Sequence, residues 1–341
     1  MKERVAIIFG GKSSEYEVSI SSAASVIRAI DKEKYDLVYI GITKDGHFKK
    51  VECSPSDIES NRWVELSEDF SPWDLKKVAD FALPIVHGPN CEDGKLQGIL
   101  ELVDIPYGGC GVLASAVAMD KIIAKDVFRN AGIPVVKDID VFKGDDIAVK
   151  IYQIENTLGF PVFVKPANMG SSVGITKAHT SEELMRAIEV AFRYDKRVIV
   201  EEAINAREIE TGVLGNSDPK VAVCGEIVPK TAEFYDYEAK YTDGASRLDI
   251  PANIPDEVSD KIRAYAIKAY KAIDGEGFSR CDFFLDKENG NIYLNEINTI
   301  PGFTRNSMFP LLWEGTGKAY KDTIEEIIRL GHERYNAKNS R

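Results

Sequence analysis

The chain has 341 residues, of which 44% are hydrophobic and 29% are charged, and its formal net charge is −12. One hydrophobic core rarely serves so long a chain, so we expect two or three domains. The negative charge argues against nucleic acid as a partner, because phosphate backbones are bound by Lys and Arg.

The cysteines, histidines and apolar runs exclude further classes of protein. Five cysteines without a C-x-x-C pair predict reduced thiols, and four histidines without metal-ligand spacing argue against a zinc site. The first apolar run is too short for a signal peptide, and no stretch reaches the ~18 apolar residues of a membrane span. We therefore expect a soluble, cytoplasmic protein with no membrane partner.

The first 111 residues alternate apolar runs with helical patterns. The predicted elements are strands at residues 5–9, 36–43 and 81–86, helices at 19–30 and 95–103, and an aperiodic surface segment at 53–75. Such alternation, with glycine at strand ends, is typical of a parallel α/β unit that binds ligands at the carboxyl ends of its strands.

The pattern changes in the rest of the chain. The predicted elements are one long helix at residues 114–131, strands at 160–165 and 197–204, a helix capped by Thr180 and Glu183, an amphipathic helix at 258–273, and a C-terminal helix at about 318–335. A hairpin is predicted near the end, because Asn289-Gly290 separates two alternating runs.

The predicted hairpin carries charged side chains that suit a metal. Arg280 shares one strand face with Asp282, because side chains alternate between faces. Glu296 and Asn298 share one face of the return strand, and counting from the turn places Glu296 within about one residue of Asp282. Two carboxylates this close repel each other unless a cation such as Mg²⁺ joins them. The apolar flanking residues disfavour the alternative of a solvated polar face.

The loop "PANMGSSVGITKA", which follows Lys165, suits phosphate. Its glycines let backbone amides approach a phosphate, and Ser171 and Ser172 add hydroxyl donors. Strands flank the loop on both sides, unlike a P-loop, and alone it is equally an ordinary polar turn. Together with a Mg²⁺ site it predicts an ATP site.

Several other charged residues carry little information singly. A lone lysine such as Lys121 or Lys240 is usually solvated, and acids such as Glu201 and Glu208 are more often at the surface. The N-terminal turn "FGGKSSEYEVS" disfavours a dinucleotide-binding dehydrogenase, because it lacks G-x-G-x-x-G and contains Glu15.

Seven motifs in order resemble one family over nearly the whole chain. They are FGGKSSEYEVS, HGPNCEDGKLQG, MDK, FVKPANMGSSVG, FYDYEAKY, SRCDFF and NEINTIPGFT. Together they resemble the D-alanine–D-alanine ligases of the ATP-grasp superfamily. The resemblance implies an α/β and α+β, three-domain ATP-grasp fold: an N-terminal, Rossmann-like parallel-sheet domain at 1–111, a central subdomain at 112–210, and a C-terminal subdomain at 211–341.

The resemblance also implies an activity and its requirements. ATP phosphorylates the carboxylate of one D-alanine, and the amine of a second D-alanine attacks the acyl phosphate, which gives ADP, phosphate and D-alanyl-D-alanine. The product serves peptidoglycan synthesis, and so cell wall biogenesis and cell shape. The resemblance implies two Mg²⁺ ions, which Mn²⁺ can replace, and it is compatible with activation by K⁺. It also implies a homodimer.

The resemblance assigns a role to each matching residue. Glu15 meets the ammonium of the first D-alanine and forms a loop-closing triad with Ser171 and Tyr241. Arg280 stabilises the oxyanion with help from the Gly302 amide. The other substrate contacts are Val18, His87, Ser307 and Met308. The ATP contacts are Lys121, Lys165, Ser172, Glu201, Glu208 and Lys240, and the metal ligands are Asp282, Glu296 and Asn298.

The identity of the second substrate stays open at this stage. Related resistance ligases accept D-lactate or D-serine; the D-lactate type carries His at the position of Tyr241, and many carry Arg at that of Met308, which favours D-alanine here. Arg305-Asn306 replaces the usual Ser-His, and Cys91 a usual Gly, so a D-alanine–D-serine ligase remains an alternative. Another ATP-grasp carboxylate–amine ligase and a non-catalytic two-lobed binding protein are further alternatives.

Overall fold

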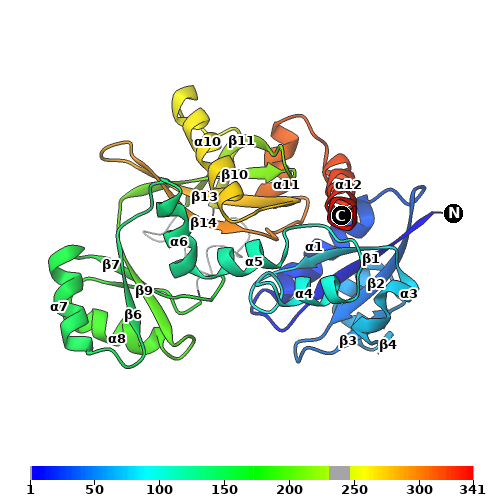
Figure 1. The fold of residues 1–341 in the computed structure, drawn as a ribbon, viewed down its shortest axis with the longest axis horizontal. Coiled ribbons are helices and arrows are strands. Elements are labelled where there is room, and N and C mark those ends of the chain that lie inside the picture. Colours follow the sequence, from blue (N-terminus) through cyan, green and yellow to red (C-terminus); the bar gives the residue numbers. More distant parts are fainter. Residues whose placement is uncertain (1, 172, 230–245, 341) are drawn as a thin grey trace.

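The computed structural model describes residues 2–171, 173–229 and 246–340, which form three β-sheets with helices packed around them (Figure 1). The five-stranded N-terminal sheet has the order β4-β3-β2-β1-β5. Its strands are β1 (Glu3–Gly10), β2 (Tyr35–Ile42), β3 (Phe48–Val51), β4 (Ser67–Asp69) and β5 (Phe81–Val86). The accompanying helices are α1 (Tyr16–Ala29), α2 (Pro55–Glu59), η1 (Arg62–Val64), η2 (Pro72–Asp74), α3 (Leu75–Val78) and α4 (Lys95–Leu102).

The parallel core of this sheet is the part that the sequence predicted best. β1 pairs in parallel with β2 and with β5, and residues 5–9 of β1 are at most 1% exposed. A strand covered on both faces has no polar side to alternate with, which explains the continuous apolar run. Gly10 then turns the chain with a φ of 85°, where a Cβ would strike the Ile42 carbonyl.

The prediction of an aperiodic surface segment at residues 53–75 is wrong in part. The segment contains α2, η1, β4 and η2, and Trp63 within it is fully buried. The Trp63 ring lies edge-on to Phe9, with centroids 5.2 Å apart, in space left by the missing side chain of Gly41. Turns this short show no period, so one buried tryptophan escaped the pattern.

The middle of the chain forms an antiparallel sheet of order β6-β9-β7-β8. Its strands are β6 (Asp138–Phe142), β7 (Val162–Pro166), β8 (Thr176–Ala178) and β9 (Arg197–Glu202), and its helices are α7 (Ile147–Thr157) and α8 (Ser181–Ala191). The loop between β7 and β8, residues 167–175, is called the flap; strands flank it on both sides, as predicted, although β8 lies within the stretch predicted as loop. Thr180 caps α8 by accepting from the Glu183 amide, as expected.

The predicted single helix over residues 114–131 is wrong. The chain forms two helices, α5 (Val112–Met119) and α6 (Lys121–Asn130), separated at Asp120. Asp120 adopts φ −88° and ψ 104°, and its carboxylate accepts from the Ile123 amide at 3.2 Å. The same carboxylate accepts from Asn168 of the flap and pairs with Arg197, so tertiary partners favour the break.

The C-terminal sheet has the order β12-β11-β10-β13-β14. Its strands are β10 (Ala206–Leu214), β11 (Lys220–Pro229), β12 (Ser246–Asp249), β13 (Phe278–Asp286) and β14 (Ile292–Asn298), and its helices are α10 (Asp256–Ala272), α11 (Met308–Gly315) and α12 (Tyr320–Asn339). The expected boundary at residue 210 falls inside β10. Among the described helices, none is both long and apolar enough to cross a membrane.

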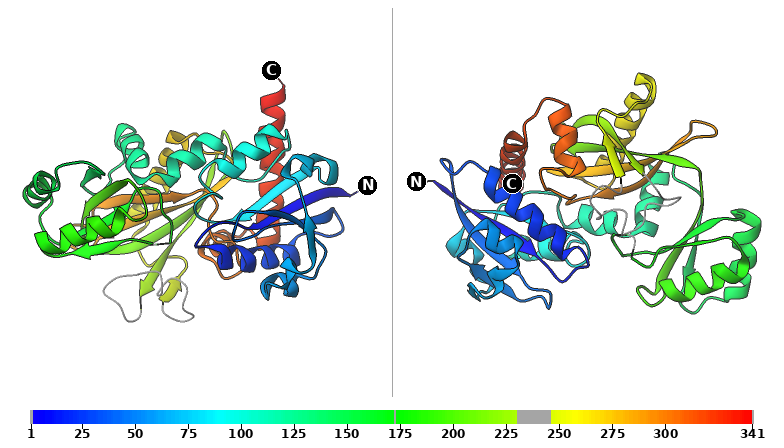
Figure 2. Two further views of the ribbon diagram at one scale, coloured as in Figure 1. Left: turned by 90° about the horizontal axis from the view of Figure 1, so that it is seen from below. Right: turned by 180° about the vertical axis from the view of Figure 1, so that it is seen from behind.

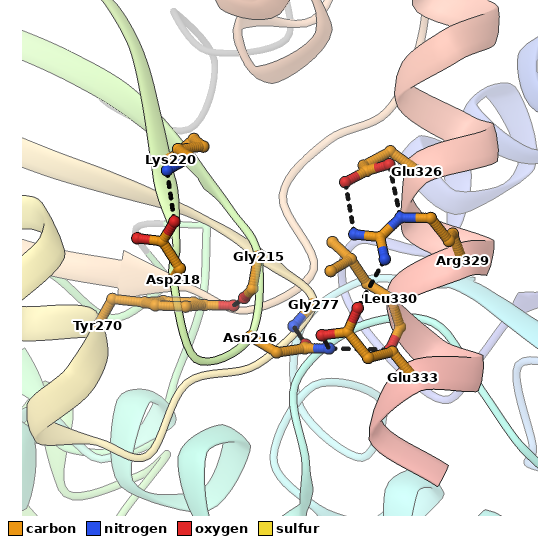
Figure 3. Close-up of polar contacts among 10 residues, drawn as sticks. All are labelled: Gly215, Asn216, Asp218, Lys220, Tyr270, Gly277, Glu326, Arg329, Leu330 and Glu333. Carbon is orange, nitrogen blue, oxygen red and sulfur yellow. Dashed lines mark hydrogen bonds and ion pairs between the residues drawn. The ribbon is translucent and has the colours of Figure 1, made fainter. Parts of the chain in front are cut away.

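Helix α12 returns to the N-terminal sheet (Figure 2). Its buried Ile324, Ile327 and Ile328 belong to the same hydrophobic core as the strand β1. The turn between β10 and β11 joins it through Asn216, whose amide nitrogen lies 3.1 Å from the Leu330 carbonyl and 3.1 Å from Glu333 Oε1 (Figure 3). Asn216 Oδ1 accepts from the Gly277 amide at 2.9 Å. We call this contact the junction.

The five cysteines are free thiols, as predicted. Four are buried, and burial raises the pKa of Cys91 and Cys110 to about 12. Cys91 fits the turn after β5, with its sulfur against Gly11.

Candidate active site

A cleft of about 1440 Å³ is lined by strands of the middle and C-terminal sheets and by α1 and loops beside the N-terminal sheet. It contains every predicted site residue that the structure describes: Glu15, Val18, His87, Lys121, Lys165, Ser171, Glu201, Glu208, Arg280, Asp282, Glu296, Asn298, Gly302, Ser307 and Met308. The predicted Ser172, Lys240 and Tyr241 lie outside the described residues.

The hairpin of β13 and β14 brings the predicted metal ligands together. Asp282 pairs with Glu296, and Arg280 with Asn298, whereas the sequence placed Asp282 within about one residue of Glu296. Asn298 donates its amide nitrogen to Asp282 Oδ2 at 2.9 Å, which leaves its amide oxygen as an acceptor. No described group of three or more His, Cys, Asp and Glu side chains is placed to hold a metal. Two carboxylates and one amide oxygen fit Mg²⁺, which takes its other ligands from water and phosphate.

Arg280 is held by two acids at this end of the cleft. Its Nε lies 2.7 Å from Asp282 Oδ1 and 2.9 Å from Glu210 Oε2. Burial disfavours the guanidinium charge, but Asp282 and Glu210 outweigh it and raise the pKa of Arg280 well above its usual range. Arg280 is therefore a fixed positive charge. Glu210 was not predicted, because it lies in a strand whose pairing with Asp282 is set only in three dimensions.

Glu15 lies where the N-terminal domain meets the flap. Helix α1 begins at Tyr16, three residues before its predicted start, so Glu15 is the residue immediately before the helix. A Cβ on Gly170 of the flap would lie 2.7 Å from Glu15 Oε2, and one on Gly88 would also strike it. Two glycines thus let the backbone close around this carboxylate.

His87 is buried at the end of β5, and both of its ring nitrogens are engaged. Nδ1 lies 2.7 Å from the Ile300 carbonyl, so it carries the proton, and Nε2 lies 3.2 Å from Ser22 Oγ. Burial lowers the pKa of His87, against the opposing charge of Glu15. The neutral ring therefore links the N-terminal domain to the loop after β14.

The base of the flap is held by polar contacts. Lys121 donates to the Met169 carbonyl at 2.6 Å, and the Asn168 amide donates to Asp195 at 2.9 Å. Lys165 at the end of β7 lies 2.6 Å from Glu201 Oε2. Two predicted nucleotide contacts, Lys165 and Glu201, are thus already paired with each other.

Two family models match the chain, described as the D-ala D-ala ligase N-terminus over residues 4–110 and the D-ala D-ala ligase C-terminus over residues 127–329. The chain belongs to the D-alanine–D-alanine ligase family. A D-alanine–D-alanine ligase of Clostridium acetobutylicum is 49% identical, with 99% of this chain and 100% of that protein covered, and one of Acetivibrio thermocellus is 46% identical over 98% and 97%.

Solved structures of the D-alanine ligase family share the ATP-grasp fold. The VanG D-Ala:D-Ser ligase of Enterococcus faecalis superposes with a TM-score of 0.88 at 38% identity, covering 97% of this chain and all of that one. The D-alanine–D-alanine ligase of Coxiella burnetii has a TM-score of 0.88 at 32% identity, covering 99% and 98%. The expected fold class is therefore confirmed.

The predicted contacts of the second substrate, Ser307 and Met308, lie at the start of α11 and line the cleft. Ser307 Oγ lies 3.0 Å from the Thr304 amide and 2.7 Å from Thr304 Oγ1, next to Gly302. Met308 is 5% exposed and packs against Gly225. Arg305 is exposed and does not line the cleft, whereas Asn306 does. The predicted extra cation, Arg305, is therefore not part of the cleft lining.

Sequence reasoning missed Glu92 and Lys125. Glu92 lines the cleft, and burial together with the charge of Glu15 raises its pKa well above the usual range. Lys125 lies behind the cleft, 2.7 Å from Glu201 Oε1. The motif "CEDG" contained Glu92, but nothing in the spacing of Lys125 marked it as buried.

Proposed function

We propose that this protein joins two D-alanines into D-alanyl-D-alanine with conversion of ATP to ADP and phosphate, for peptidoglycan synthesis. The observation that supports it most directly is one cleft that contains Glu15 together with Asp282, Glu296 and Asn298. The Glu15 carboxylate can pair with an ammonium group. The oxygen atoms of Asp282, Glu296 and Asn298 are ligands that Mg²⁺ prefers, and Mg²⁺ can bind phosphates at the same time. Relatives named D-alanine–D-alanine ligase at 46–49% identity support the same function.

In the proposed reaction, the first D-alanine is held by its ammonium group at Glu15 and by its methyl group at Val18. Its carboxylate oxygen attacks the γ-phosphorus of ATP, and ADP leaves. The amine of the second D-alanine, which is held through its carboxylate by Ser307, then attacks the acyl carbon. Arg280 and the Gly302 amide stabilise the oxyanion before phosphate leaves and the amine loses a proton.

Further proposed roles concern binding and closure. Lys121, Lys165, Ser172, Glu201, Glu208 and Lys240 would contact the nucleotide. Asp282, Glu296 and Asn298 would hold Mg²⁺, or Mn²⁺ in its place, and the metal would neutralise phosphate charge. Ser171 and Tyr241 would join Glu15 in closing the flap, because an acyl phosphate must be kept from water. His87 would position the first substrate from its place at the strand end.

The wider setting is proposed from the family resemblance. We expect three working domains at residues 1–111, 112–210 and 211–341, a cytoplasmic homodimer, and K⁺ as a compatible activator. Gel filtration coupled to light scattering, and turnover measured in Na⁺ and K⁺ buffers, would test the assembly and the activator separately.

The decisive experiment measures ADP release with Mg²⁺-ATP and D-alanine, with L-alanine as control and mass analysis of the product. D-Alanyl-D-alanine as the main product is expected, because the residue next to Ser307 is the apolar Met308, which offers no donor to a hydroxyl group. A parallel mixture of D-alanine and D-serine tests the alternative of a D-alanine–D-serine ligase, which the similarity to the VanG D-Ala:D-Ser ligase also suggests. A mixed D-alanyl-D-serine product as the main species would overturn the proposed acceptor.

A further inference from the structure

A charged network lies behind one wall of the cleft and connects α6, β6, β9 and β7. Lys125 Nζ lies 2.7 Å from Glu201 Oε1, and Lys165 Nζ lies 2.6 Å from Glu201 Oε2. Lys125 also lies 3.4 Å from Asp138 Oδ1, and Asp138 pairs further out with Arg129. Strands β6 and β9 place Asp138 directly opposite Glu201. The cleft-facing carboxylate is thus held by one cation in front and one behind.

Lys125 has no access to a ligand of its own. It is 1% exposed and does not line the cleft, whereas Glu201 and Lys165 both do. Lysine is almost never buried this deeply unless it is paired. Lys125 follows Lys121 by one helical turn, so one face of α6 supplies a lysine to the flap and another to Glu201. Any influence of Lys125 on the cleft must pass through Glu201.

The two lysines decide the ionisation of Glu201. Burial alone would raise the pKa of Glu201, but the neighbouring Lys125 and Lys165 lower it to about 2. An ionised carboxylate accepts hydrogen bonds and donates none. A base with an amino group can donate a hydrogen bond to this carboxylate. A base with an oxo group in the same place would put its oxygen, also an acceptor, against the carboxylate oxygen.

The two cations do not serve Glu201 in the same way. Lys165 lines the cleft and precedes the flap, so bound phosphates would compete with Glu201 for its ammonium group. Lys125 cannot be drawn away in this manner, because no ligand reaches it. Lys125 therefore keeps the negative charge of Glu201 paired while Lys165 contacts the nucleotide.

We propose that Lys125 is a positioning residue for nucleotide selection: it holds Glu201 as a fixed acceptor from behind, so that the cleft prefers a purine bearing an amino group to one bearing an oxo group at the same position. The inference rests on the proposed function, in which Glu201 is one of the nucleotide contacts, and it assigns the base of ATP to that contact. It adds a residue that touches no substrate and sets which base is accepted.

The test compares the binding of ADP and of inosine diphosphate, with Mg²⁺, by calorimetry. The two nucleotides differ by an amino group in one and an oxo group in the other. The wild type is expected to favour ADP at least about tenfold, the size of one hydrogen bond to a charged group. Lys125→Met is expected to lose most of this preference through weaker ADP binding. Equal ratios in the wild type and in a folded Lys125→Met variant would overturn the proposal.

Lys150→Met is the matched control. Lys150 donates to the Asp140 carbonyl at 2.7 Å, on the strand β6 that also carries Asp138, and neither its hydrogen bond nor its ion pair involves Glu201. Its replacement removes a partly buried lysine of α7 that donates to the same sheet, and it should leave the ADP preference unchanged. A loss of preference equal to that of Lys125→Met would mean that general loosening of the sheet is the cause.

Two further variants keep the test decisive if Lys125→Met folds poorly. Lys125→Arg should restore the ADP preference, because a cation again faces Glu201. In a Glu201→Gln variant, the glutamine side chain carries no charge for Lys125 to stabilise. Adding Lys125→Met to that variant should therefore not lower the preference for ADP further. An additive loss in the double variant would contradict action through Glu201.

Binding of ADP needs no amino-acid substrate, so the two proposals can fail separately. A wild type that binds both nucleotides equally yet ligates D-alanine would overturn only the role of Lys125. An intact ADP preference that disappears in Lys125→Met, without any D-alanine turnover, would support the role of Lys125 and overturn the proposed ligation.

Discussion

The network behind the cleft and the junction beside α12 hold distant segments together by opposite means. Behind the cleft, a buried carboxylate lies between two lysines at 2.6 and 2.7 Å. At the junction, the neutral amide of Asn216 serves the Gly277 amide, the Leu330 carbonyl and the Glu333 carboxylate (Figure 3). Buried charges carry a large desolvation cost and need close partners, whereas an amide carries little. The buried charges lie behind the cleft, where a ligand is expected to bind. At the junction, where segments are only held together, a neutral amide is sufficient.

This difference predicts separate consequences for the two regions. Substitutions of cleft residues that contact ligands should alter binding and turnover, and at the buried charge of Glu201 they should also lower the free energy of unfolding. Substitutions at the junction should lower the free energy of unfolding and leave the kinetic constants alone. Variants of Arg280, Glu201, Asn216 and Arg329 test that separation.

The largest effect is expected for Arg280→Met. Arg280 is a fixed cation between Asp282 and Glu210, and removal of one oxyanion-stabilising donor costs about 10²–10³ in kcat. Steady-state ADP release with D-alanine measures the loss. A kcat within threefold of the wild type would contradict the oxyanion role and place Arg280 with the purely structural groups.

The second effect is a pH dependence set by Glu201. Its folded pKa of about 2 lies below the usual value for glutamate, so its stabilising contribution is present above pH ~4.5 and is lost as the pH falls toward 2. The full contribution is about 3 kcal/mol, shared with Lys125, Lys165 and Asp138 around it.

Urea unfolding of the wild type and of Glu201→Gln, at pH 6 and at pH 3.5, measures this contribution. The difference in unfolding free energy between the two proteins should shrink at the lower pH. A difference that is constant, or that grows on acidification, would show that the lysines do not hold the carboxylate ionised.

The third effect is a loss of stability at the junction. Asn216→Ala removes three hydrogen bonds of a half-buried side chain, which should cost about 1–3 kcal/mol of unfolding free energy. Denaturant unfolding measures this, and kcat and KM should stay within twofold of the wild type. The exposed Asp218→Ala in the same turn is the control, since it breaks only an ion pair with Lys220.

The smallest effect is expected on the outer side of the junction. Arg329 pairs with Glu326 and Glu333, but its side chain is 54% exposed, and solvent screens such pairs. Arg329→Gln should therefore cost less than about 1 kcal/mol, and the cost should fall further in high salt. A loss as large as that of Asn216→Ala would mean that the junction depends on its charges after all.

The hairpin is the part of the site that local pattern predicted most completely. Asn289-Gly290 predicted the turn, and counting from it placed Asp282 within about one residue of Glu296; the structure pairs the two, with a register shift between Asp282 and Phe283. Both signals act within about ten residues, so distant contacts had little opportunity to override them. The parallel strand β1 was predictable for a similar reason, because its burial on both faces is written in one apolar run.

The failures share a different cause. The helix break at Asp120 depends on Asn168 and Arg197, which approach from other parts of the chain. The burial of Trp63 depends on the space beside Gly41 and Phe9. Neither environment leaves a local periodicity, so pattern reasoning extended the helix and assigned the tryptophan's segment to the surface.

The sequence by itself determined the family, the fold class and the residue types gathered in the cleft, because ordered motifs and strand alternation are properties of neighbouring residues. Only the tertiary structure decided the partner of each charge: Lys125 and Lys165 on Glu201, Glu210 on Arg280, and the Ile300 carbonyl on His87. Each of these groups is distant in the chain from the charge or ring that it contacts, and Lys165 is the nearest in sequence to its partner. Ionisation in a buried site depends on such partners and on exclusion from water, and both arise only when the strands and helices pack.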